Sequence, residues 1–221
     1  MNQWTTHFLN ASGQLTPYRS QIETLISRVQ TRIGTLCPIH KLDIVVQVSA
    51  VSVIPEIGIG GHCSAEDLIY LSIDPDNPNL ENPLGQAFER ITTHEYHHAM
   101  RWKTLGYDRT LGQALVSEGL AGHFVRELYN SRPERWECAI AVKDMHQHIP
   151  AALSEYDNTS YPHAEWFFGT GKFQNWLGYS MGFELVRQYL KHHPNTAPSR
   201  LADKPAIDFK PSLQLLSDEL A

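Results

Sequence analysis

Apolar residues recur at intervals of three and four positions through several long stretches of the chain, a pattern typical of amphipathic helices. The first forty residues are predicted to be helical, with a helix from about Thr16 to Leu36 and Pro17 in its first turn. Four later stretches are also predicted to be helical, namely 82–106, 111–129, 133–148 and 177–190. Gly106 is expected to end the first of them and Pro150 to end the third. Residues 154–176 have no clean period, which indicates an ordered loop or lid.

Three shorter runs are rich in β-branched residues and predict strands, at 42–54, 57–63 and 68–73. Gly58, Gly60 and Gly61 argue against a central position for the second run, because glycine packs nothing inside a sheet. They favour an edge strand that another backbone can approach, such as an extended peptide substrate. A loop through these glycines is the alternative.

Strands early in the chain and helices afterwards predict an α+β fold with no alternating βαβ pattern. A length of 221 residues favours one domain over 1–221, with a sheet-containing part at about 40–105 and a helical part at about 106–221. The small N-terminal sheet is expected to be mixed.

Charge and composition exclude several classes of function. There are 18 basic and 24 acidic residues, a net charge of −6, and no basic run, so nucleic acid is not an expected partner. We expect neither a membrane span nor an export signal, since no apolar stretch is long enough and the start has no apolar core. Three scattered cysteines provide no disulfide framework, which favours the cytoplasm.

Twelve histidines invite a search for metal ligands, and their spacing is decisive. Residues 94–98 read HEYHH, which contains the HExxH motif. On a helix, His94 and His98 lie one turn apart on the same face and can bind one zinc ion, while Glu95 beside them can act as a general base.

A catalytic zinc site needs a third protein ligand and one position for water. Our candidate is Glu118, on the next predicted helix after a short connection at about 106–109. Small neighbours such as Gly119, Ala121 and Gly122 would let two helices approach closely. The plainer alternative is a solvated glutamate among small residues that serve helix packing.

The sequence contains other candidates for the third metal ligand. The longer HExxHxxGxxH pattern is excluded, because Arg101 and Thr104 stand where glycine and histidine are required. His97 points about 100° away from His98, on an outer face or behind the ligands. His123 could support a ligand or only pack between helices, and Cys63 could bind metal as a cysteine does in peptide deformylase.

The segments HEYHHAMR, SEGLAGHF and GYSMGFELV, with the proline-rich tail, resemble the YjaZ-like bacterial family of predicted zinc-dependent proteases. More broadly they are similar to gluzincins, which implies a zincin-like fold with an HExxH helix beneath a small sheet. The resemblance implies that His94, His98 and Glu118 bind the metal and that Glu95 is the base.

These features predict a zinc-dependent metallopeptidase with one Zn²⁺ per chain and a peptide or protein substrate. Tyr179 is the first choice as donor to the oxyanion, followed by His163 and Tyr161. Two alternative functions stay open, namely a deformylase-like amidohydrolase for small substrates and a regulatory module that binds zinc without catalysis.

Overall fold

The computed structural model describes residues 3–82, 84–106 and 109–219. The chain forms two compact units, residues 1–103 and 104–221. The arrangement of the chain as a single domain stays a prediction.

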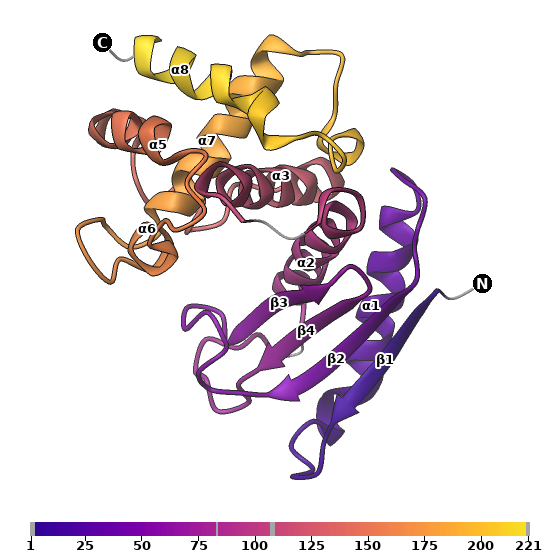
Figure 1. The fold of residues 1–221 in the computed structure, drawn as a ribbon. Helices are drawn as coiled ribbons and strands as arrows, with labels where there is room; N and C mark the ends of the chain where they lie inside the picture. Colours follow the sequence, from indigo (N-terminus) through magenta and orange to yellow (C-terminus); the bar gives the residue numbers. More distant parts are fainter. Residues whose placement is uncertain (1–2, 83, 107–108, 220–221) are drawn as a thin grey trace. The chain divides into compact units, whose positions relative to one another are not determined.

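The first unit contains a four-stranded sheet in the order β1-β2-β4-β3 (Figure 1). Strands β1 (Trp4–Leu9), β2 (Leu42–Val48) and β4 (Leu68–Ile73) are parallel to one another. Strand β3 (Ile59–Ala65) runs antiparallel to β4 and lies at the edge. The sheet is therefore mixed, as expected, and the glycine-containing strand is an edge strand.

Two expectations about this sheet were wrong. The first forty residues are not all helical, because Trp4–Leu9 forms β1 and pairs in parallel with β2. The connection between them is helix α1 (Arg19–Ile33), so the unit contains one βαβ crossover where none was expected. A six-residue strand with two threonines and a histidine gives only a weak apolar alternation, which explains the error.

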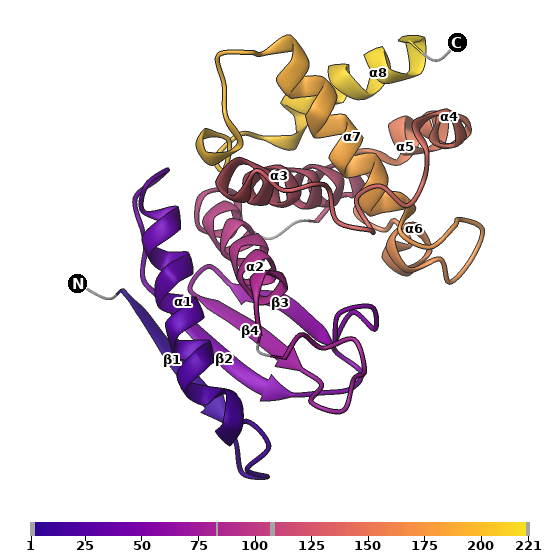
Figure 2. The same cartoon turned by 180° about the vertical axis from the view of Figure 1, so that it is seen from behind.

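Helices α1 and α2 (Gln86–Leu105) both cover one face of the sheet, as the two opposite views show (Figures 1 and 2). The residues of α1 that the periodicity selected are all buried, namely Ile22, Leu25, Ile26, Val29 and Ile33. They face a sheet whose buried side chains include Ile44, Val46, Ile69 and Leu71. Gly106, with φ +79°, follows the last residue of α2 as predicted.

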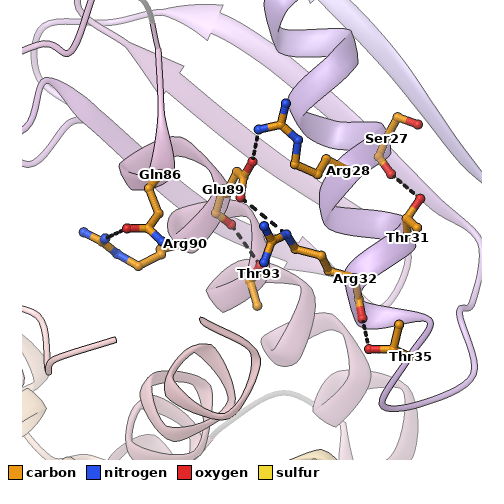
Figure 3. A network of polar contacts seen from close by, with 9 residues as sticks. All are labelled: Ser27, Arg28, Thr31, Arg32, Thr35, Gln86, Glu89, Arg90 and Thr93. Carbon is orange, nitrogen blue, oxygen red and sulfur yellow. Dashed lines mark hydrogen bonds and ion pairs between the residues drawn. The ribbon is translucent and has the colours of Figure 1, made fainter. Parts of the chain in front are cut away.

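Glu89 connects the first turns of α2 to α1 (Figure 3). Its side chain is only 5% exposed, and its carboxylate lies 2.8 Å from Arg28 Nη1 and 3.9 Å from Arg32 Nε. A buried carboxylate needs such partners. The ion pairs therefore fix the N-terminal part of α2, five residues before the HExxH motif, on the surface of α1.

The second unit is built around α3 (Leu111–Tyr129) and α7 (Leu177–His192), whose bounds agree with the predicted helices. Thr110 and Gln113 form a capping box that begins α3. A Cβ atom on Gly119 would overlap the Gly182 carbonyl oxygen. The two helices therefore cross with their backbones in close approach, and only glycine fits at the crossing.

Shorter helices surround this pair, and here the sequence interpretation was less accurate. In place of one helix at 133–148 there are turns followed by α4 (Val142–Met145) and a 3-10 turn. Pro150 does not end a helix but lies in the first turn of α5 (Ile149–Glu155), where its missing N–H costs nothing. The expected loop at 154–176 contains α6 (His163–Phe168), and the tail ends in α8 (Lys210–Glu219).

None of the helices in the described part of the chain is long and apolar enough to cross a bilayer.

Candidate functional site

Helix α2 carries both histidines of the HExxH motif on one face. The imidazole rings of His94 and His98 have their centroids 4.7 Å apart and are nearly perpendicular, with an interplanar angle of 79°. His94 is buried at 9% exposure, and His98 is half-buried. Two nitrogen donors in this arrangement suit a divalent metal such as zinc.

Glu95 lies against the backbone of the edge strand. A Cβ atom on Gly61 of β3 would lie 2.5 Å from Glu95 Oε1, so the carboxylate occupies the space that a side chain at position 61 would need. Glu95 is 6% exposed, whereas Gly61 is exposed. The glycine therefore lets the carboxylate sit directly beside an accessible strand, which is a reason for glycine at this position that the sequence alone did not reveal.

Tyr96, the first variable residue of the motif, anchors the opposite side of the helix. Its hydroxyl accepts a hydrogen bond from the His40 backbone N–H at 3.2 Å, and its ring stacks on His40 and packs against Trp4. Burial raises the pKa of the Tyr96 hydroxyl far above its usual value. Because Tyr96 is two residues from both His94 and His98, it points away from them and fixes the rotation of α2 about its axis.

His97 is fully buried, so its placement on an outer face was wrong. Every residue from Ile91 to His97 is buried, which the sequence pattern of this helix did not predict.

Glu118 lies on α3 in the second unit and is half-buried. The small residues around it pack within the second unit. Gly119 contacts α7, and a Cβ on Gly122 would overlap the buried Glu137 side chain. Gly119 and Gly122 thus serve packing within the second unit, as in the plainer alternative, whereas Glu118 itself is half-buried and not fully solvated. Tyr107 and Asp108 of the short connection before α3 lie outside the described residues.

His94 and His98 of α2 and Glu118 of α3 each offer one ligand atom for a metal ion. Cys63 is not among them. It is buried in β3, where its Sγ donates to the Ala65 carbonyl at 3.3 Å.

The three candidate oxyanion donors belong to one aromatic cluster in the second unit. Tyr161 Oη and His163 Nδ1 are 2.8 Å apart, His163 stacks on Phe167, and the Tyr179 ring meets Phe167 edge-on. Desolvation among these rings lowers the pKa of His163, and the negative charge of Glu118 opposes this shift.

His123 packs between helices. Its ring stacks on Phe183 of α7, and its Nε2 lies 3.0 Å from the Phe183 carbonyl oxygen, to which it donates. Burial lowers the pKa of His123 to about 4, so the ring is neutral at neutral pH.

A cavity of about 280 Å³ opens beside the Glu89 ion pairs, between α1 and the start of α2. Its lining includes Arg28, Arg32 and Gln86, and it contains none of the residues predicted for the site.

Comparison with known proteins supports the sequence resemblance. A family model described as "Predicted Zn-dependent protease (DUF2268)" matches residues 19–209. The uncharacterized protein YjaZ of Bacillus subtilis (strain 168) is 30% identical over 112 residues, which cover 45% of this chain and 41% of YjaZ. The uncharacterized protein YjfC of the same strain is 24% identical over 151 residues, covering 62% of this chain and 48% of YjfC. The chain thus spans about half the length of these relatives, and no solved structure matches it.

Proposed function

Because the chain belongs to the DUF2268 family of predicted zinc-dependent proteases, we propose that it is a zinc-dependent metallopeptidase that hydrolyses peptide bonds. The observation that carries the proposal is the pair of imidazoles 4.7 Å apart on α2, with the Glu95 carboxylate beside them against an accessible edge strand.

In this proposal His94, His98 and Glu118 bind one zinc ion. Two nitrogens and one carboxylate oxygen are a ligand set that catalytic zinc uses with a fourth position for solvent. The proposed ligands lie at similar distances from the connection between the helices, since His98 lies seven residues before the end of α2 and Glu118 seven residues after the start of α3. Each is therefore about 10 Å along its helix from the short connection.

Zinc bound in this way lowers the pKa of a water molecule to about 7 and polarises a carbonyl group. Glu95 takes up the proton that is released and delivers it to the nitrogen of the departing amine. Glu95 is 6% exposed and therefore lies sheltered from bulk solvent.

An extended peptide is the substrate form that suits this site. An edge strand can pair with a substrate backbone through main-chain hydrogen bonds, which makes binding tolerant of the substrate sequence. Gly61 of β3 is both exposed and adjacent to Glu95, so a peptide paired there would lie beside the base.

The proposal is tested with Glu95→Gln. Protein purified without added metal is expected to contain about one zinc per chain by elemental analysis, and the variant should keep it while losing hydrolysis of casein. His94→Ala should lose the zinc, whereas His146→Ala, a histidine of the other unit, should not. Hydrolysis by Glu95→Gln at the parental rate would assign the base to another residue, and a well-folded chain without zinc would end the ligand assignment. Short formylated peptides in the same assay identify a deformylase-like activity.

Tyr179 is proposed as the donor that stabilises the oxyanion. Tyr179→Phe is then expected to lower kcat by about 10²- to 10³-fold with unchanged zinc content, because only the hydroxyl is removed. Tyr161→Phe, in the same aromatic cluster, is the matched comparison, and a larger effect there would transfer the role to the Tyr161 and His163 pair.

A further inference from the structure

The outer edge of β3 is divided into two parts. At Ile59 the edge is already occupied, since the Ile54 N–H donates to the Ile59 carbonyl at 3.0 Å and the two residues form an antiparallel bridge. Alternate residues of a strand direct their backbone groups to the same side. Gly61 therefore faces outward as Ile59 does, while the Gly58 carbonyl accepts from Asp74 N on the β4 side.

The segment from Ser52 to Gly58 covers the beginning of the strand. Backbone N–H groups of Ile57 and Gly58 both donate to the Ile54 carbonyl, at 3.0 and 2.9 Å, and close a tight turn. A Cβ on Gly60 would lie 2.9 Å from Val53 Cα and would overlap the Ser52 carbonyl oxygen. The segment is thus held against β3 by backbone contacts, at the edge through the Ile54–Ile59 bridge and over the strand at Gly60.

Gly61 is the first outward-facing residue of β3 that segment 52–58 does not cover. Gly61 is exposed, and within the described residues no outward hydrogen bond is made by its backbone. This is also the residue against which Glu95 packs. The first unoccupied position of the edge therefore coincides with the position of the proposed base.

We propose, on the premise of the peptidase function above, that segment 52–58 acts as a stop. It blocks the outer edge of β3 on one side of Gly61, so that a bound substrate pairs with the strand on the other side only. An extended peptide pairs antiparallel with β3, the more stable of the two pairings, from Gly61 toward the register irregularity between Cys63 and Ala65. Its residues on the amino-terminal side of the scissile bond lie along the strand. On the carboxyl-terminal side the extended path reaches the position of Ile54 after about two residues, counted along the register of β3.

The chain therefore recognises peptides mainly through residues that precede the scissile bond. Residues further than about two positions after that bond gain no strand pairing, so peptide bonds near a carboxyl terminus are accepted as readily as internal ones.

Binding to the Glu95→Gln protein tests this inference without depending on hydrolysis. The probes are fluorescein-labelled peptides with a Leu-Ala core and one to six alanines added on one side, measured by fluorescence anisotropy. Amino-terminal additions up to four residues are expected to lower Kd at least tenfold, and carboxyl-terminal additions beyond two less than twofold. N-methylation along the amino-terminal part should weaken binding at alternate residues only, because strand pairing has a period of two.

A variant of the stop gives the second arm. Ile54→Pro lacks the N–H that binds Ile59, and carboxyl-terminal additions are expected to tighten binding to it, whereas Val51→Ala at an exposed position should behave as the parent. Equal gains from both sides with the parent chain, no peptide binding, or N-methyl effects without alternation would overturn the inference. Zinc-dependent casein hydrolysis together with symmetric binding would refute the stop and leave the peptidase proposal standing. Asymmetric binding with no hydrolysis by the parent chain would support the stop and refute the peptidase proposal.

Discussion

Neighbouring residues of the HEYHH segment serve unrelated purposes, because an α-helix turns by about 100° at each residue. His94 and His98 share one face, Glu95 packs against Gly61, and Tyr96 bonds to the backbone of His40. Only the shared face of the two histidines follows from the motif. The role of Tyr96 depends on what lies on the far side of the helix, and no spacing rule encodes this.

His123 gives the second unit a pH-dependent stability. Its folded pKa of about 4 lies below the ordinary value of 6.5 because the ring is buried. Above pH 6.5 the folded and unfolded chains both hold it neutral. Between pH 6.5 and about 4 only the unfolded chain binds the proton, so the free energy of unfolding falls as the pH falls, by about 3 kcal/mol over this range.

Urea denaturation at pH 7 and pH 4.5 measures this contribution. His123→Gln keeps an amide N–H for the Phe183 carbonyl but cannot titrate, so its stability should change less with pH than that of the parent. His192→Gln, at an exposed histidine of α7, should retain the parental pH dependence. If the free energy of unfolding changed equally with pH in His123→Gln and in the parent, the titration of His123 would contribute nothing to the pH dependence.

At the scale of elements, α2 is held by an ion pair of unequal exposure. Glu89 is 5% exposed while Arg28 is 52% exposed, so the carboxylate loses most of its hydration and relies on the guanidinium groups of α1. If the interaction with the arginines is weakened, the buried charge of Glu89 is left uncompensated, which lowers the free energy of unfolding. Since Glu89 lies five residues before His94 on the same helix, the pair also positions the motif.

Glu89→Gln is expected to lower the free energy of unfolding by about 1 to 3 kcal/mol, measured by urea denaturation, because a charge-assisted hydrogen bond is replaced by a weaker one. Glu23→Gln is the matched control. It breaks the exposed Arg19–Glu23 pair within α1 and should cost less than about 0.5 kcal/mol. Equal losses in the two variants would mean that burial of Glu89 does not matter.

For the whole molecule, the proposed metal ligands are His94 and His98 of α2 and Glu118 of α3. Zinc that binds only the folded chain then stabilises it by mass action, by about 2.7 kcal/mol when free zinc is one hundred times Kd. The chain spans about half the length of its curated relatives, so the activity and partners of the whole proteins stay proposals.

Tm measured with and without zinc, after removal of metal by EDTA, tests this linkage. Zinc should raise the Tm of the parent chain. Glu118→Ala should lose most of the increase, and Glu184→Ala, at another half-buried glutamate on a helix of the second unit, should keep it. A full zinc effect in Glu118→Ala would remove this residue from the ligand set.

Local periodicity and spacing determined a large part of this protein. The buried face of α1, the bounds of α3, the strand β4 and the edge position of the glycine-containing strand were all predicted, because each depends on side chains close together in the sequence. The HExxH motif is equally local, since both histidines lie on one helix.

The remainder required the tertiary structure, because it depends on pairs distant in the sequence. Strand β1 is a strand through its pairing with β2, more than thirty residues later. The burial of His97, the contact of Gly61 with Glu95 and the crossing of Gly119 over Gly182 likewise depend on which surfaces meet. Burial and close approach are properties of packed elements, and a hydrophobic pattern specifies only that a face is covered, not what covers it.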